Sequence, residues 1–149
     1  MNRIKLICTG NLKFRELQVL QKRYLQMVNN YVEFSIQEIR DAPGNSEKEG
    51  KAMLQALKER DFVIALDRLG QMYDSPGMAR LLAAKMADLP GRLVFLIGGA
   101  DGLSHLLEPR INQKLSFSAL TMAHDLFRLV FLEQLYRSLT IIQGSPYHR

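Results

Sequence analysis

The sequence predicts an α/β fold in which a mostly parallel sheet is flanked by helices, with a single domain spanning residues 1–149. Strand-like and helix-like segments alternate along the whole chain, which is the pattern of repeated βα units. Residues 62–66 are apolar without alternation, as in a strand that is covered on both faces. No internal repeat, low-complexity tract or linker interrupts the 149 residues, a length sufficient for a normal hydrophobic core.

Four segments have the composition of strands, and a fifth short segment precedes the last helix. The first two, residues 3–8 and 32–37, alternate between polar and apolar side chains. The next two, residues 62–66 and 93–97, are continuous apolar runs. The short segment covers residues 114–118.

Four segments have the apolar spacing or the boundary residues of helices. The second helix follows a turn cluster at residues 41–46. The third begins with Ser75 as its N-cap and Pro76 in the first helical position, both favourable there. The fourth runs from about residue 121 to residue 142. The inward positions of the first three are Leu17, Leu20, Tyr24, Val28 and Tyr31; Met53, Leu54 and Leu57; and Leu81, Leu82 and Met86.

The last helix is apolar on more than one face, whereas a surface helix needs an apolar stripe of only about 100°. Its apolar residues are Leu126, Phe127, Leu129, Val130, Phe131, Leu132, Leu135, Tyr136 and Leu139. Its main polar breaks are Asp125, Arg128, Glu133, Gln134 and Arg137. We therefore predict a homodimer through this helix. The alternative is a central helix that is buried within one domain.

The composition, 47% hydrophobic and 23% charged, is that of an ordinary globular protein. No apolar run approaches the roughly 18 residues of a membrane span, and the first eight residues lack the pattern of a signal peptide. Cys8 is the only cysteine and resembles a small buried hydrophobic residue, as in a reducing compartment. We therefore expect a cytoplasmic protein without membrane association.

The net charge of +5 is dispersed along the chain, so a nucleic-acid partner is permitted but not required. The histidines, His105, His124 and His148, have no ligand spacing, and we expect no metal site. The sequence contains neither a Gly-x-Ser-x-Gly elbow nor a P-loop. The first strand leads to Gly10 alone, where a dinucleotide fingerprint needs three glycines.

The apolar run 93–97 leads directly into Gly98-Gly99-Ala-Asp-Gly102. Glycines at this position let the backbone turn sharply or approach a ligand closely. The pattern alone does not decide between a tight structural turn and a ligand loop.

Three segments follow predicted strands and are expected to converge at one edge of the sheet, where open α/β sheets bind ligands. They are Leu66 with Asp67, Gly98 with Gly99, and the run from Phe117 to Met122. None of them carries a cluster of Lys or Arg for phosphate groups. We therefore expect a ligand that is held by backbone groups and apolar side chains, such as an adenine–sulfonium compound.

Four ordered motifs resemble the bacterial ribosomal RNA large-subunit methyltransferase H family, which belongs to the SPOUT class. They are Val94-Phe-Leu-Ile-Gly-Gly-Ala-Asp-Gly-Leu-Ser104, Leu115-Ser-Phe-Ser-Ala-Leu-Thr-Met-Ala-His124, Leu132-Glu-Gln-Leu-Tyr-Arg137 and Pro146-Tyr-His-Arg149. The resemblance extends over nearly the whole chain and includes the opening strand with Gly10, Glu49-Gly50 and Ile64-Ala-Leu-Asp67. It implies a SPOUT-type fold with a C-terminal trefoil knot and a homodimer.

The resemblance also implies an activity: S-adenosylmethionine-dependent methylation of N3 of a pseudouridine in 23S ribosomal RNA, within the assembled ribosome. Two alternatives remain. One is a non-catalytic RNA- or ribosome-binding factor on the same fold. The other is a SPOUT methyltransferase for a different RNA position.

Carried over by position, the resemblance implies a cofactor site of eight residues. They are Leu66, Gly98, Phe117, Ser118, Ala119, Leu120, Thr121 and Met122. Tyr147, His148 and Arg149 match the family's C-terminal motif, which implies a tail that completes the active site across the dimer. We expect His148 or Arg149 to assist removal of the N3 proton.

The chain departs from the family pattern at a few positions. Ala123 replaces the proline that is usual before the histidine, and Asn11 and Gln71 stand where basic residues are frequent. The loop at residues 41–46 is short for the family. None of these positions belongs to the implied cofactor contacts.

Overall fold

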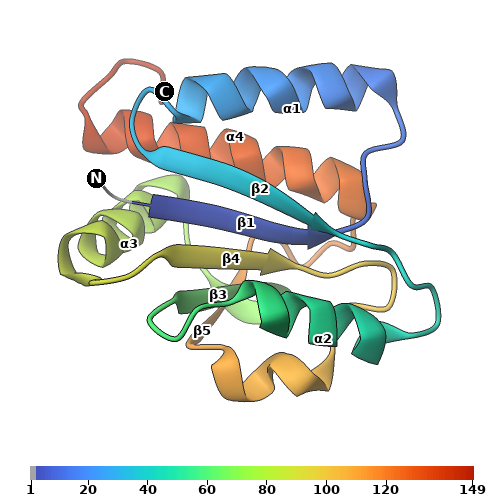
Figure 1. The fold of residues 1–149 in the computed structure, drawn as a ribbon. Helices are drawn as coiled ribbons and strands as arrows, with labels where there is room; N and C mark the ends of the chain where they lie inside the picture. The colour runs from blue at the N-terminus through green and yellow to red at the C-terminus, as the bar shows by residue number, and fades with distance from the viewer. Residues whose placement is uncertain (1–2) are drawn as a thin grey trace.

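A computed structural model describes residues 3–149 and contains a five-stranded sheet, in the order β2-β1-β4-β3-β5, with helices on both faces (Figure 1). Every strand pair is parallel, as the alternation of strands and helices predicts. The elements are β1 (Arg3–Thr9), α1 (Arg15–Val28), β2 (Glu33–Ile39), α2 (Ser46–Ala56), β3 (Phe62–Met72), α3 (Ser75–Asp88), β4 (Leu93–Ile97), η1 (His105–Arg110), β5 (Gln113–Ser116) and α4 (His124–Ile142). The predicted α/β fold is therefore confirmed, while the C-terminal knot stays a prediction.

The central strand, β4, is buried along its whole length and pairs with both β1 and β3. Phe95 aligns with Leu6 of β1 on one side and with Ile64 of β3 on the other. A strand with a sheet neighbour on each edge and helices on both faces has no polar face, which explains its continuous apolar run.

Side chains on the two faces of the sheet enter two separate hydrophobic cores. One core lies beneath α1, α3 and α4 and includes Phe95 and Phe131, whose ring centroids are 4.9 Å apart. The other lies beneath α2 and η1 and includes Met53 and Leu107. The short helix η1 was not predicted from the sequence.

The apolar excess of α4 is explained within one chain, because this helix packs between α1 and α3 and against the sheet (Figure 1). Four of its polar residues are also buried: Asp125, Arg128, Ser138 and Thr140. Arg128 is only 1% exposed and donates hydrogen bonds to the Gly10 carbonyl oxygen (2.8 Å), Glu38 Oε2 (2.9 Å) and Gln21 Oε1 (3.3 Å). The alternative of a central buried helix therefore describes α4, and its composition no longer argues for a dimer.

Several predicted boundaries differ from the structure. Asp74, and not Ser75, caps α3, since its Oδ1 accepts a hydrogen bond from the Gly77 N–H at 2.7 Å. The last helix begins at His124 because the preceding residues form an extended loop. Strand β3 continues beyond residue 66 as far as Met72, with a shift in register against β5. No helix within residues 3–149 is long and apolar enough to cross a membrane.

A buried ion pair between Asp61 and Arg92 links the starts of β3 and β4. Asp61 and Arg92 precede these strands and form two hydrogen bonds, Arg92 Nε to Oδ1 at 2.8 Å and Nη2 to Oδ2 at 2.6 Å. Burial acts to raise the pKa of Asp61, but the hydrogen bonds from Arg92 and from the Lys58 N–H outweigh it and lower the pKa below its ordinary value.

We expect Asp61→Asn to reduce the free energy of unfolding at neutral pH by about 3 kcal/mol, because Arg92 would lose its charged partner. The folded-state pKa of Asp61 lies below the unfolded value, so the stabilisation is present above about pH 4 and is lost as the pH falls through the folded-state pKa. Urea denaturation of the variant and wild type at several pH values measures this, and their stabilities should converge in acid.

The exposed pair of Arg3 with Glu33, 3.1 Å apart, provides a matched control. Glu33→Gln should change the free energy of unfolding by less than about 1 kcal/mol at neutral pH. A pH-independent loss of stability in Asp61→Asn would contradict the assignment to the ion pair.

Candidate functional site

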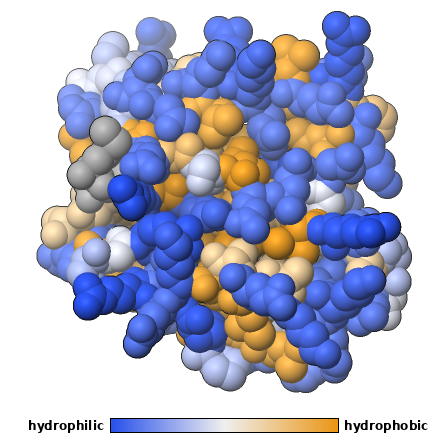
Figure 2. All heavy atoms as spheres, in the orientation of Figure 1, coloured by the Kyte–Doolittle hydropathy of each residue, from blue (hydrophilic) through white to orange (hydrophobic). Residues whose placement is uncertain are grey.

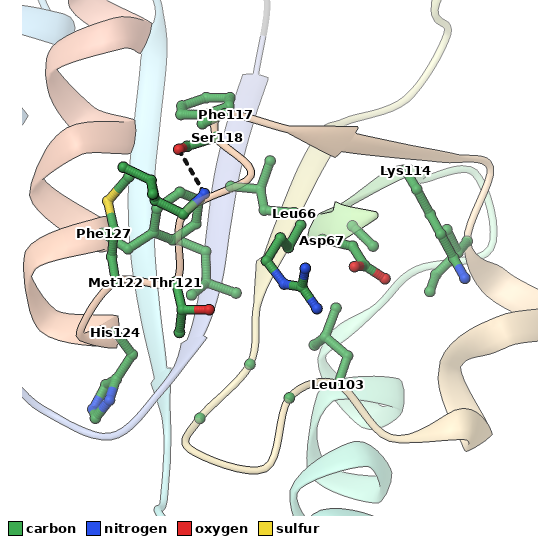
Figure 3. Close-up of a pocket in the computed structure, with 18 of the residues that line it drawn as sticks. Leu66, Asp67, Leu103, Lys114, Phe117, Ser118, Thr121, Met122, His124 and Phe127 are labelled. Carbon is green, nitrogen blue, oxygen red and sulfur yellow. Dashed lines mark hydrogen bonds between the residues drawn. The ribbon is translucent and has the colours of Figure 1, made fainter. Parts of the chain in front are cut away.

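A cavity of about 420 Å³ lies at the carboxyl ends of β4 and β5 and beside residues 65–68 of β3, where the register of β3 against β5 shifts after Leu66. These three strands are neighbours in the sheet, so their cavity-lining segments lie side by side (Figure 3). The start of α4 and the end of η1 complete the lining. This is the edge at which open parallel sheets bind ligands.

The glycine loop after β4 forms one wall of the cavity and is also a tight turn. The Gly102 N–H donates to the Gly99 carbonyl oxygen at 3.0 Å, and Gly102 has a φ of +73°. A Cβ on Gly98 would lie 2.5 Å from the Gly102 carbonyl carbon, so the backbone approach requires glycine. All three glycines line the cavity. The two interpretations of this motif are therefore compatible.

The loop after β5 forms the opposite wall and is held by its own hydrogen bonds. Ser118 Oγ accepts from the Leu120 N–H at 2.9 Å (Figure 3). Ser116 Oγ donates to the Ser118 carbonyl oxygen at 3.1 Å. The Phe117 ring packs edge-on against Phe127, with 5.7 Å between centroids. The loop is thus fixed to α4 and keeps its backbone groups along the cavity.

The structure brings together seven of the eight residues predicted for cofactor binding. Those that line the cavity are Leu66, Gly98, Phe117, Ser118, Leu120, Thr121 and Met122. Ala119 is exposed and does not line it.

Four charged side chains line the cavity, and they carry two charges of each sign. Asp67 was expected at this edge beside Leu66, whereas Arg68, Glu108 and Lys114 were not predicted there. Lys114 Nζ lies 2.7 Å from Glu108 Oε1, and this hydrogen bond raises the pKa of Lys114. Glu108 belongs to η1, a six-residue helix that is too short to show an apolar periodicity in the sequence. For this reason neither η1 nor the position of Glu108 could be predicted.

His124 lies at the edge of the cavity, away from Leu66 and Asp67 (Figure 3). Its Nε2 is 3.0 Å from Oδ1 of Asp125, an atom that is buried and has no hydrogen-bond partner within residues 3–149. The other carboxylate oxygen of Asp125 faces the Lys13 N–H at 3.5 Å. The cavity rim is therefore connected through Asp125 to the segment that precedes α1.

The C-terminal tail lies elsewhere in the same chain. Tyr147 donates from its hydroxyl to Glu133 Oε1 at 3.1 Å, and His148 Nδ1 lies 3.1 Å from Arg137 Nη1. Arg137 in turn donates to Glu133 at 2.6 Å. From His124 to Arg137, α4 rises about 20 Å. Tyr147, His148 and Arg149 are thus not brought to the cavity of their own chain.

Two chemical properties of the tail follow from these contacts. Burial, and secondarily the hydrogen bond to Glu133, raises the pKa of Tyr147 to about 12, so its phenol stays protonated at neutral pH. Arg137 is a donor only, so His148 Nδ1 must accept, and the imidazole carries its proton on Nε2.

The described residues, 3–149, contain no group of three or more His, Cys, Asp or Glu side chains that could hold a metal ion. Cys8 is buried and unpaired, and burial raises the pKa of its thiol to about 12. Neither feature contributes to the cavity.

Comparison with known proteins links this geometry to methyltransferases. A family model described as "Predicted SPOUT methyltransferase" matches residues 2–148. The chain is 37% identical to the "Ribosomal RNA large subunit methyltransferase H" of Streptococcus mutans, over 99% of both chains. It is 35% identical to the protein of the same name from Christiangramia forsetii, over 97% of this chain and 98% of that one.

A solved structure has a similar fold. It is described as "Crystal Structure of Probable Methyltransferase from Bordetella pertussis Tohama I" and superposes with a TM-score of 0.58. The superposition covers 93% of this chain and 95% of that chain at 13% sequence identity. At this identity the likeness concerns the fold alone.

We expect Gly98→Ala to disturb the glycine loop, because the added methyl group would meet the Gly102 backbone rather than a flexible side chain. The free energy of unfolding should fall by about 1–3 kcal/mol, and the Gly102 amide should lose protection from hydrogen exchange. Gly144→Ala is the control: its φ of +71° imposes strain of about 1–2 kcal/mol, but open space surrounds it. That variant should leave the loop amide protected, and a protected amide in Gly98→Ala would refute the close approach.

Proposed function

The chain belongs to the SPOUT methyltransferase family, within the group of the ribosomal RNA large subunit methyltransferase H proteins, and on this premise we propose its reaction. We propose that it transfers a methyl group from S-adenosylmethionine to N3 of a pseudouridine in 23S ribosomal RNA of the assembled ribosome. The observation that carries the proposal is the cavity at the carboxyl edge of the sheet, built from the family's motifs. Relatives at 35–37% identity that bear this name support the substrate class.

The residues of the cavity fit an adenine–sulfonium cofactor. Its volume of about 420 Å³ falls within the range of about 300–1,000 Å³ for small-molecule sites. Apolar side chains such as Leu66 and Phe117 offer surface to a base, while the Gly98 and Thr121 backbones offer hydrogen bonds. The balanced charges of the lining suit the ammonium and carboxylate of an amino-acid tail better than a triphosphate.

When bound, this cofactor supplies an electrophilic methyl group on a sulfonium. The protein must then align the attacking nitrogen with that methyl group and remove the N3 proton. The two walls of the cavity, fixed by the Gly99–Gly102 turn and by the Ser118 hydrogen bonds, provide the alignment. Within one chain, the cavity residues with a proton-accepting side chain are Asp67, Glu108 and His124. Glu108 is already paired with Lys114, and His124 lies only at the rim.

We propose that proton removal uses the tail of a partner subunit in a homodimer that forms through α4. From Phe127 at the cavity to Glu133 and Arg137, which hold the tail, α4 rises about 9–15 Å. Exposed apolar side chains near the cavity, Leu69, Met72, Leu120 and Leu126, offer a surface for this partner. Sedimentation analysis that shows a stable monomer at micromolar concentration would exclude the arrangement.

Each tail residue has a distinct proposed role. His148 is the candidate base, once it exchanges the contact of Nδ1 with Arg137 for the substrate. Arg149 cannot accept a proton, so we assign it the stabilisation of negative charge on the imide or a contact with phosphate. Tyr147, which stays protonated, positions the tail through Glu133.

Two alternative functions are separated from the proposal by two measurements. Calorimetric titration with S-adenosylhomocysteine should show binding, whereas a non-catalytic ribosome-binding factor would show none. Mass mapping of ribosomal RNA from a deletion strain should show one missing methyl group on a pseudouridine of the large subunit. Loss of a methyl group at another kind of nucleotide would assign the enzyme to a different RNA position.

Deletion of residues 147–149 should lower methylation of ribosomes at least 100-fold, because the base and the adjacent cation are removed. The affinity for S-adenosylhomocysteine should change by less than about twofold, since no deleted residue lines the cavity. His105→Ala, which changes an exposed histidine of η1, is the control and should retain full activity. Normal turnover by the truncated protein would show that the tail has no part in the chemistry.

A further inference from the structure

An exposed aromatic ring with basic neighbours stands where the chain enters α1. Phe14 is 64% exposed, and Lys13 and Arg15 flank it in the sequence. A phenylalanine this exposed contributes nothing to the core, and both flanking side chains also face solvent. Such an arrangement resembles the stacking platforms of proteins that bind single-stranded nucleic acid.

The backbone at this position is held firmly, so that the ring has a defined place. The preceding residue, Leu12, is buried, and its carbonyl oxygen accepts a hydrogen bond from Gln18 Nε2 at 2.7 Å. The Gln18 N–H donates to the Phe14 carbonyl oxygen at 3.1 Å. The platform is therefore part of the folded framework and not of a free loop.

Further basic side chains lie along the outer face of α1, beyond the Phe14 ring. Arg15, Val19, Lys22, Arg23 and Gln26 are all exposed, and their spacing places them on the side opposite the core. None of the three cations forms an ion pair within residues 3–149, so their charge is available to an anionic partner. Figure 2 shows mainly hydrophilic side chains over α1 with apolar patches between them.

This surface begins next to the cavity rim. Asp125, which faces the Lys13 N–H, is adjacent in sequence to His124 of the cavity lining. Arg128, one turn further along α4, binds the Gly10 carbonyl oxygen and so fixes the segment that leads to Phe14. An RNA chain that leaves the cavity past His124 would therefore reach Phe14 first and then the basic face of α1.

We propose that Phe14 and the basic face of α1, formed by Lys13, Arg15, Lys22 and Arg23, are an RNA-binding track for the nucleotides that flank the target base. The proposal rests on the proposed function for the identity of the RNA. Phe14 stacks on one unpaired base, and the cations contact successive phosphates, which gives affinity without sequence readout. An aromatic ring between unpaired cations favours RNA over a protein partner, because RNA supplies a base that stacks on the ring and phosphates that bind the cations.

The test uses the full-length protein and a fluorescein-labelled RNA hairpin with an unpaired loop, titrated by anisotropy at several salt concentrations. Phe14→Ala should weaken binding roughly 5- to 100-fold with an unchanged salt dependence, and Phe14→Tyr should restore it. Arg15→Gln with Lys22→Gln should weaken binding and reduce the salt slope by roughly 0.7 for each removed charge. Unchanged affinity in Phe14→Ala would overturn the proposal.

The double variant Lys48→Gln, Lys51→Gln is the matched control, because it removes two exposed charges from α2 on the other face of the sheet. An equal loss of RNA affinity in this variant would show that only the net charge of the protein matters, and the proposed RNA-binding track would be wrong. Binding of all variants to intact ribosomes is measured in parallel. If α1 variants lose ribosome binding but bind the hairpin normally, the face contacts a ribosomal protein and the RNA assignment is wrong.

Failure of this inference is distinguishable from failure of the proposed function. All α1 variants should bind S-adenosylhomocysteine as the wild type does, since none of the changed residues lines the cavity. If the α1 variants lose hairpin binding but even the wild type does not bind S-adenosylhomocysteine, the RNA-binding track is supported and the proposed methyltransferase activity is refuted. Normal hairpin binding by variants of an active methyltransferase would refute the track alone.

Discussion

The parallel pairing of β4 with both β1 and β3 is the constraint on which the rest of this structure depends. Because all strands point the same way, the carboxyl ends of β4 and β5 and residues 65–68 of β3 lie side by side at one edge. Burial of β4 on both faces fixes its register, since a shift by one residue would exchange the two cores. The cavity is thus a consequence of the strand order in the sheet. Its walls are the glycine turn after β4, Leu66 of the neighbouring β3 and the loop 117–122 after β5.

The helix α4 connects this edge to the remainder of the molecule. It packs between α1 and α3, and its buried Arg128 donates hydrogen bonds to α1, to β2 and to Gly10, which directly follows β1. A buried guanidinium without these partners would be strongly destabilising, so its three acceptors hold the α4 start in one position relative to the sheet. The same contacts fix the Gly10 segment, and thereby place Phe14 beside the cavity rim. One buried cation thus couples the cofactor edge to the surface on which we propose that RNA lies.

The two parts of the proposed active site lie at different positions along α4. The cavity adjoins its first residues, including His124, while Tyr147 and His148 are held further along the helix by Glu133 and Arg137. This separation is the argument for the proposed homodimer. The composition of α4 does not support it, because that composition is explained by packing within one chain. In the proposed assembly, cofactor and base would come from different subunits, and methyl transfer would depend on correct association.

The sequence by itself determined the α/β class and the order of strands and helices, because these depend on local periodicity. Seven of the cavity residues were implied by the resemblance of short contiguous motifs to the family. The loop 117–122 and the glycine turn each lie within one segment, so their patterns are visible without the fold. Only the tertiary structure decided which polar groups meet. Arg128 reads as a polar break on a helix, yet it is buried, because its partners come from residues about 90 to 118 positions away. The charged lining of the cavity was missed for the same reason: Glu108 and Lys114 belong to η1 and β5, and only the parallel register brings them beside Asp67. Periodicity encodes which face of an element is buried, but the pairing of charges across elements depends on distances that folding alone establishes.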